Sequence, residues 1–457
     1  MTTDAAPPRR YLVVGTGHRA ELFLEALRTT HRDVGRVVAL CDTNPTRMAH
    51  HAAAFGDEVP ATYRADDFAR ALDEQRPDGV VVCSVDATHH RYVVPALAAG
   101  CHTVVEKPLT TTAEACRAIV AAAERGPGRL TVTFNYRYAP RNSRVKQLLL
   151  EGAIGRPTSV HFEWVLDTVH GADYFRRWHR DKANSGGLFV HKATHHFDLV
   201  NWWLDDVADT VNAQAALRFY GDVNARERGL GERPAHGRDL LDDPFAIDLA
   251  GDDRLRALYL DAEAEDGYRR DVDVFAPGIT IEDNHAVLVR YRRGAFLSYA
   301  LNAHSPWEGY RVAINGTRGR LELDVVERAE ILHGQAADVV NGRRREVDPS
   351  AVEVADTSAV RRRGTRLVLQ RHWSPAEVVD VVEEGGGHGG GDRRLLDDVF
   401  RGTDPARDPL GRAAGHLDGV RSVLVGVAAN ASAAADGAPV RLTDLDVPVD
   451  PPVSAPT

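Results

Sequence analysis

Apolar and polar residues follow a repeating pattern over the first 135 positions. Apolar positions recur at helical spacing in residues 21–27, and Thr111 with Glu114 has the spacing of a capping box ahead of a helix over residues 115–123. Short runs rich in β-branched residues separate the helical stretches and predict buried strands over residues 11–14, 37–40, 80–83, 103–105 and 130–134. The alternation predicts a Rossmann-type, doubly wound parallel sheet of α/β class over residues 1–135.

The pattern changes beyond residue 135. Helical spacing predicts one helix over residues 141–150 and a second, opened by glycines, over residues 185–204. Alternating residues separated by turn signals predict strands over residues 158–165, 286–291, 295–300, 310–314 and 320–323. We therefore expect residues 136–457 to form an α+β domain with a large, mostly antiparallel open sheet that binds substrate and joins subunits.

Two stretches of the second domain lack this patterning. Residues 221–275 are charged, irregular and rich in Asp, and residues 335–371 are similarly polar, so we expect both to be surface insertions. Near the end of the chain, helical spacing predicts C-terminal helices within residues 395–434, which are candidates to return to the first domain.

Composition limits the class of protein. The 457 residues include 56 Lys plus Arg against 66 Asp plus Glu, and the net charge of −10 argues against nucleic acid as the main partner. No window approaches the roughly 18 apolar residues that a membrane span needs, and the start lacks an apolar signal-peptide core, so we expect a cytoplasmic protein. The four cysteines lack paired spacing and are expected to be buried, reduced thiols.

The first predicted strand leads into a glycine motif and then a helix. Gly15-Thr16-Gly17-His18-Arg19-Ala20 matches G-x-G-x-x-A in the setting that a dinucleotide-binding motif requires. Gly15 permits the tight turn, Gly17 leaves room for a pyrophosphate, and Ala20 lets the helix pack closely. The backbone N–H groups at the helix start can then hold phosphates.

Asp42, at the end of the second predicted strand, favours NAD over NADP. A carboxylate there accepts hydrogen bonds from the adenosine ribose hydroxyls and repels a 2′-phosphate. Arg47 is close enough along the chain to weaken this preference, and Asp42 has an alternative role as the cap of the helix after Asn44.

Three further motifs follow, two of them after predicted strands and the third in the predicted helix over residues 185–204. They are Glu106-Lys107-Pro108, the run from Ser84 to His89, and Gly186-Gly187 followed by His195 and Asp198. With these motifs the chain resembles, over nearly its whole length, the NAD(P)-dependent sugar dehydrogenases of the glucose-fructose oxidoreductase, inositol dehydrogenase and rhizopine catabolism (Gfo/Idh/MocA) family.

The resemblance implies a cofactor site and two catalytic residues. Lys107 would polarise the substrate oxygen, His195 would exchange the proton, and the Lys107–Pro108 peptide is expected to be cis. The residues expected to bind NAD are Gly15, Thr16, Gly17, His18, Arg19, Asp42, Ser84, Val85, His89, Glu106 and Lys107.

One residue departs from the family pattern. His191 stands four residues before His195, where many members have Asp or Asn, and Lys192 adds a cation beside it. The candidates for acid/base work are therefore Lys107, His191, Lys192 and His195. A zinc site of the H-E-x-x-H type is disfavoured because Lys192 occupies the position of its glutamate, and no metal is expected.

Several residues are candidates for substrate contact. Residues 174–182, YFRRWHRDK, form either a solvated basic face or a site for an anionic or hydroxyl-rich sugar. Residues 383–392 hold six glycines and form either a flexible connection or a loop that approaches a ligand. The full set of substrate candidates is Asn135, Tyr136, Arg137, Tyr174, Arg177, Trp178, Lys192, His195, Asn284 and His388, with packing between domains as the alternative for Arg137.

These features predict an NAD-dependent oxidoreductase that acts on a secondary hydroxyl, or the ketone, of a sugar, cyclitol or glycoside. One alternative is an NAD-dependent glycoside hydrolase that oxidises a ring hydroxyl transiently, eliminates the aglycone and adds water, with an anionic sugar as a candidate substrate. Another is a non-catalytic NAD-binding regulator, which has no need for Lys107 and His195 together. We expect a homo-oligomer, a dimer or tetramer, formed through the sheet of the second domain.

Overall fold

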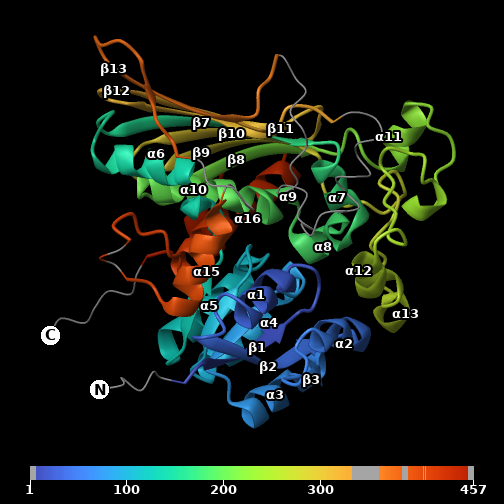
Figure 1. Cartoon of the computed structure of the whole chain (residues 1–457). Coiled ribbons are helices and arrows are strands. Elements are labelled where there is room, and N and C mark those ends of the chain that lie inside the picture. Colours follow the sequence, from blue (N-terminus) through green and yellow to red (C-terminus); the bar gives the residue numbers. More distant parts are fainter. Residues whose placement is uncertain (1–6, 332–359, 383–389, 405, 407, 451–457) are drawn as a thin grey trace, which may run out of the picture.

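The computed structural model describes residues 7–331, 360–382, 390–404, 406 and 408–450. Two sheets form opposite ends of the molecule, and helices fill the space between them (Figure 1). The predicted loop 383–392, including His388, lies outside the described residues except for its last three positions.

The first sheet has six parallel strands in the order β3-β2-β1-β4-β5-β6, which confirms the doubly wound α/β class. Strand β3 was not predicted because only Tyr63 of its four residues is buried. The strands are β1 Arg9–Val14, β2 Gly35–Asp42, β3 Ala61–Arg64, β4 Gly79–Val82, β5 His102–Val105 and β6 Arg129–Val132. The helices are α1 Ala20–Arg28, α2 Pro45–Ala53, α3 Phe68–Gln75, α4 His89–Ala98 and α5 Ala113–Arg125.

Helix α5 begins one residue away from the predicted cap. Thr112, and not Thr111, has the extended backbone of an N-cap, and its hydroxyl oxygen accepts a hydrogen bond of 3.2 Å from the Ala115 N–H. The capping-box prediction at Thr111 and Glu114 was therefore wrong in register.

The second sheet has nine strands in the order β14-β13-β12-β11-β7-β10-β9-β8-β15. Strand β10 runs parallel to β7 and the other described neighbours are antiparallel, which confirms the mostly antiparallel sheet. The strands are β7 Pro157–Asp167, β8 Ala208–Ala216, β9 Asn284–Tyr291, β10 Phe296–Ser305, β11 Glu308–Gly316, β12 Gly319–Arg328, β13 Gly364–Arg371, β14 Glu377–Val379 and β15 Val440–Arg441.

Strand β13 corrects part of the expected surface insertion 335–371. It pairs with β12 along eight residues, and its apolar side chains Leu367 and Leu369 are buried. The pattern was missed because polar residues surround the strand on both sides. Residues 335–359 lie outside the described part of the chain.

The helix expected over residues 185–204 is divided into three. Gly186 and Gly187 have φ of 71° and 74°, a left-handed conformation that ends one helix before the next begins. The pieces are α8 Lys182–Ser185, α9 Leu188–His191 and α10 Ala193–Leu204. Preceding them are α6 Pro140–Leu150 and α7 His170–Arg176.

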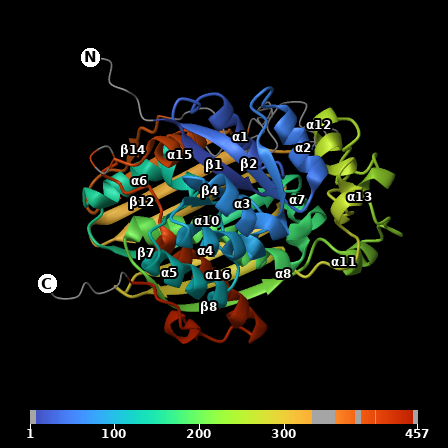
Figure 2. The same cartoon turned by 90° about the horizontal axis from the view of Figure 1, so that it is seen from below.

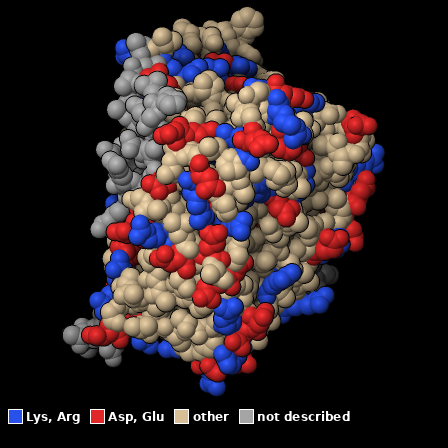
Figure 3. Space-filling view, turned by 90° about the vertical axis from the view of Figure 1, so that its right-hand side faces the viewer, with Lys and Arg blue, Asp and Glu red and all other residues tan. Residues whose placement is uncertain are grey.

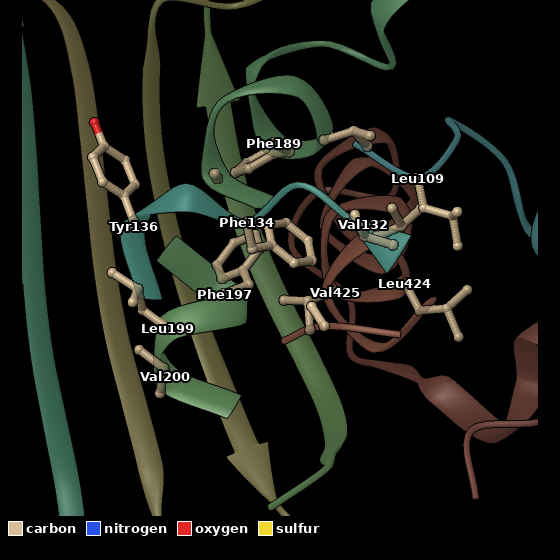
Figure 4. Packing of buried hydrophobic residues seen from close by; sticks show 14 of the residues in the cluster. Leu109, Val132, Phe134, Tyr136, Phe189, Phe197, Leu199, Val200, Leu424 and Val425 are labelled. Carbon is tan, nitrogen blue, oxygen red and sulfur yellow. The ribbon is translucent and has the colours of Figure 1, made fainter. Parts of the chain in front are cut away.

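The C-terminal helices are α15 Gly391–Arg401 and α16 His416–Ala434. Leu424 of α16 belongs to one continuous apolar core with Val132 of the first half and Phe197 of the second (Figure 4). Helix α15 packs on the opposite face of the first sheet, where the Phe400 ring meets the Tyr11 ring edge-on at 5.2 Å. Both halves are therefore held together by burial of shared apolar surface.

Residues 221–275 contain α11 Asp222–Glu227, α12 Asp253–Leu255, a π-helical turn Arg256–Leu260 and α13 Glu263–Asp266. The part of this segment that holds α12 and α13 lies beside α2 of the first half in both views (Figures 1 and 2). The Asn44 side-chain amide donates to the Ala262 carbonyl at 2.8 Å, and Arg254 pairs with Glu21 at 2.8 Å. This segment is more than the surface excursion that its composition suggested, because it contacts the nucleotide-binding half.

On the face viewed in Figure 3, acidic and basic side chains are interspersed. The net charge of −10 is not gathered into a patch of one sign on that face. No helix in the described ranges is long and apolar enough to cross a membrane.

Candidate active site

A cavity of about 530 Å³ lies at the carboxyl ends of the first sheet's strands. Its walls come from the segments that follow β1, β2, β4, β5 and β6 and, on the other side, from α7, α9, α10 and the 221–275 segment. Ligands of open α/β sheets bind at this edge, so the cavity is the candidate active site.

The glycine loop has the shape that a dinucleotide requires. Gly15 has φ of +82°, and a Cβ there would lie 2.6 Å from the backbone of Cys83, so the position tolerates only glycine. Gly17 lines the cavity, and a Cβ there would meet no atom within 4 Å. The space above Gly17 is thus open for a pyrophosphate at the start of α1.

Asp42 lines the same cavity and does not cap α2. The cap is Asn44, whose side chain accepts from the Arg47 N–H at 3.1 Å. One Asp42 oxygen accepts from the Thr16 N–H at 2.5 Å and the Thr16 hydroxyl at 2.8 Å. Thr16 is fully buried and does not line the cavity, so it holds the Asp42 carboxylate in place without itself facing the cavity. Arg47 forms an ion pair with Asp266 of the 221–275 segment.

The remaining predicted cofactor residues divide into two groups. His18, Arg19, Ser84, Val85 and Glu106 line the cavity. Arg19 and Glu106 form an ion pair of 2.7 Å. His89 lies outside the cavity lining, with its ring nitrogens 2.9 and 3.0 Å from the Pro108 and Ser84 carbonyl oxygens. His89 thus connects the loops after β4 and β5, both of which carry cavity residues.

Lys107 lies at one end of a polar chain of three side chains, with His191 in the middle. The Lys107–Pro108 peptide is cis, as expected. The Lys107 Nζ lies 3.2 Å from His191 Nε2 and 3.3 Å from the His191 carbonyl oxygen. His191 Nδ1 lies 2.5 Å from an Asp86 oxygen. These hydrogen bonds join Asp86 and Lys107 of the first half of the molecule to His191 of the second half.

Burial controls the protonation of this chain. It lowers the pKa of Lys107 to about 8, against the attraction of Asp86 and Glu106. Burial and the nearby Lys107 cation hold the pKa of His191 well below its usual range. Burial also raises the pKa of Asp86, while Lys107 opposes that rise. A neutral imidazole therefore lies between the Asp86 carboxyl group and the Lys107 amino group.

His195 and Lys192 occupy the neighbouring wall of the cavity. The His195 ring packs against the Tyr136 ring at 4.6 Å, and the Lys192 ammonium lies 4.7 Å above the Trp164 ring centre. Asn135 also lines the cavity, and its amide donates to Asp392 at 2.7 Å. The structure thus brings all four acid/base candidates together.

Three predicted substrate residues lie outside the cavity lining, namely Tyr136, Arg137 and Asn284. Tyr136 is 3% exposed, and its ring packs against the His195 ring. Arg137 is 2% exposed and donates to Asp198 at 2.8 and 2.6 Å and to Asp418 at 3.0 Å, so its guanidinium group is fully used in packing. Asn284 bonds to His304 and Asn302 within the second sheet. The predictions for Arg137 and Asn284 assumed that these side chains face the substrate, whereas in the structure they bond to partners outside the cavity lining.

Sequence reasoning missed cavity residues supplied by distant segments. Tyr259 comes from the 221–275 segment, and its hydroxyl lies 3.0 Å from His18 Nδ1. Other missed cavity residues include Asp86, His170, Asp173, His179, Asp266 and Tyr268. Within the basic segment 174–182, Tyr174, Arg177, Trp178 and His179 line the cavity, which favours a role in binding over a solvated face. Tyrosines within an otherwise charged insertion were the available signal.

Two family models match the chain. "Oxidoreductase family, NAD-binding Rossmann fold" matches residues 9–134, and "Oxidoreductase family, C-terminal alpha/beta domain" matches residues 146–442. The Rossmann match agrees with the glycine loop, and the chain accordingly has an NAD-binding domain.

Individual proteins are similar as well. A Bacillus subtilis (strain 168) protein named as an oxidoreductase, YteT, is 34% identical over 433 residues, covering 90% of this chain and 93% of that protein. Inositol 2-dehydrogenase of Paracoccus denitrificans (strain Pd 1222) is 35% identical over 173 residues, covering 37% of this chain and 47% of that protein.

A solved structure of levoglucosan dehydrogenase with NADH and levoglucosan shares the fold. Its TM-score is 0.60 at 16% identity, and the alignment covers 95% of this chain and all of that one. An Agrobacterium radiobacter oxidoreductase with NAD⁺, L-tartaric acid and magnesium has a TM-score of 0.61 at 18% identity, with 96% and 100% covered.

Proposed function

The chain belongs to the Gfo/Idh/MocA oxidoreductase family, and from this premise we propose that it oxidises a secondary hydroxyl of a sugar, cyclitol or glycoside, or reduces the corresponding ketone. The observation that carries the proposal is the Lys107 ammonium group, half-buried at the cavity end of β5 and hydrogen-bonded to His191, four residues before His195. When bound, NAD⁺ supplies the acceptor for the hydride that leaves the carbinol carbon.

Lys107 is the group that stabilises the reacting oxygen. Its cation lies in a water-poor cavity, where a positive charge lowers the free energy of a developing alkoxide more than it would in water. His191 keeps Lys107 in place, because its Nε2 accepts from the ammonium while its Nδ1–H donates to Asp86. His191 is therefore a positioning residue and not the proton acceptor.

His195 takes the proton of the substrate hydroxyl. It lines the cavity, and the Phe134 and Tyr136 rings hold its ring in place. Lys192, above Trp164, adds a second positive charge to the same wall and favours oxygen-rich substrates.

Replacing Lys107 by Met tests the proposal. Turnover of NAD⁺ to NADH with a panel of neutral and anionic sugars and glycosides should disappear, while NAD⁺ binding measured by calorimetry should stay near the wild-type value. Lys146→Met is the matched control, since the Lys146 ammonium is also buried but donates to the Trp202 carbonyl outside the cavity lining.

Two results would contradict the proposal. Activity that survives in Lys107→Met would remove Lys107 from the chemistry. Aglycone release from glycosides without net NADH would identify a redox-neutral glycosidase instead, so product analysis accompanies the absorbance assay.

A further inference from the structure

A cluster of buried arginines lies in and behind one wall of the cavity. The Asp173 carboxylate receives three guanidinium groups, at 3.2 Å from Arg176, 2.9 Å from Arg177 and 2.7 Å from Arg270. Asp173 is 3% exposed, and Arg176 and Arg270 are 2% and 4% exposed. Three cations thus share one carboxylate in a site from which water is largely excluded.

The neighbouring acidic residues do not balance this excess. Asp271, next to Arg270 in sequence, bonds to Arg238 at 2.5 and 2.7 Å. Arg177 Nε and both Arg270 Nε and Nη1 are buried without a hydrogen-bond partner among the described residues. A buried charge without a partner is costly, so the cluster fits best with an additional anion bound beside it.

Arg177 is the arginine of this cluster that reaches the cavity lining. His179, 2% exposed, lines the same wall, and its Nδ1 has no partner among the described residues. Arg177 shares Asp173 with Arg176 and Arg270. The other cavity arginines pair with different carboxylates, since Arg19 pairs with Glu106 and Arg47 with Asp266.

The place of Arg177 points to the substrate and not to the nucleotide. The His179 ring lies 4.2 Å from the His191 ring, which in turn contacts Lys107. An anion at Arg177 would accordingly be part of the molecule that Lys107 and His195 act on.

We propose that Arg177, with His179 beside it, binds a carboxylate group of the substrate, so that this enzyme acts on acidic sugars of the uronate type. The inference rests on the proposed function, and it narrows the substrate to a class. A guanidinium fork matches a carboxylate in geometry and charge, whereas a neutral sugar leaves the excess positive charge without a partner.

Matched sugar pairs test this inference. Binding of D-galacturonate and D-glucuronate is compared by calorimetry with binding of D-galactose and D-glucose to the NAD⁺-saturated protein. We expect tighter binding of at least one uronate than of its neutral partner. Arg177→Gln should reduce that preference by about 10- to 100-fold, the effect of losing a charge-assisted hydrogen bond.

Further variants separate charge from folding. Arg177→Lys keeps the cation and should retain part of the preference. Arg180→Gln is the matched control, because Arg180 donates to the Ala276 and Pro277 carbonyls outside the cavity lining and should leave the preference unchanged. Thermal unfolding of each variant verifies that it is folded.

Several outcomes would overturn the inference. They are equal binding of both sugars in a pair, no binding of either uronate, and a preference that survives in Arg177→Gln. Weaker NAD⁺ binding in Arg177→Gln without a change in sugar preference would assign the arginine to the pyrophosphate instead. Because the readout is binding, a uronate preference with no NADH formation would uphold this inference while the proposed reaction fails.

Discussion

Replacing Asp86 by Asn should move the pH dependence of catalysis. Asp86 is joined to Lys107 by hydrogen bonds through His191. Burial lowers the pKa of Lys107, and the Asp86 charge opposes this lowering more than any other charge does. The substitution keeps the size of the side chain and removes its charge. The Lys107 ammonium should then lose its proton at a lower pH.

The size of the effect follows from the pKa of Lys107. With a pKa of about 8, the group is about nine-tenths protonated at neutral pH. Loss of an interacting opposite charge lowers a pKa by about 1 to 3 units, which would leave between about one half and about one hundredth of the ammonium form. The alkaline fall in kcat/KM should therefore move from about pH 8 to about pH 7 or below.

The assay is kcat/KM for NADH formation across the pH range, with the best substrate of the panel. Asp222→Asn is the control, since Asp222 is a surface residue paired with Arg226 and should leave the alkaline fall in place. An alkaline fall that stays near its wild-type position in Asp86→Asn would refute the reasoning. It would show that Asp86 does not set the charge of Lys107, or that activity does not depend on the cation.

Two other substitutions test the cofactor site and the core. Gly17→Ala should fold with unchanged thermal stability, because the added methyl meets no atom within 4 Å. It should nevertheless lose NAD⁺ binding, measured by calorimetry. Unchanged binding would contradict the placement of the pyrophosphate above Gly17. Arg137→Met should destabilise the fold by about 3 to 5 kcal/mol in urea unfolding, since the buried Asp198 carboxylate and the half-buried Asp418 carboxylate lose their cation. The loss should be smaller near pH 5 than near pH 8, because burial raises the pKa of Asp198 to about 6 and its protonation removes one unpaired charge; a loss independent of pH would count against this account.

Local motifs predicted the nucleotide site well because its geometry is built from neighbouring residues. The turn at Gly15, the open space at Gly17 and the cis bond at Lys107–Pro108 each depend on a few consecutive positions. Strand and helix periodicity likewise predicted most strands of both sheets, although β3, β8, β13, β14 and β15 were missed.

Side-chain partners far apart in sequence were beyond such reasoning. His18 and Tyr259 are 241 positions apart, and Arg137 and Asp418 are 281 apart. Nothing in the residues around Arg137 shows that two carboxylates surround it, so a cation that looked available for substrate belongs to the core. Conversely, the tyrosines of a charged insertion signal a buried role, but nothing around Tyr259 shows that it reaches the glycine loop.

The sequence by itself thus determined the two sheets, the dinucleotide cradle and the lysine at its edge, because hydrophobic period, glycine conformation and strand ends are local properties. The tertiary structure decided which charges are paired. It connected Lys107 to Asp86 through His191, withdrew Arg137 into a buried ion pair, and left Arg177 in the cavity wall beside excess positive charge. Charge pairing depends on distance in space and on burial, and both are fixed only when the chain has folded.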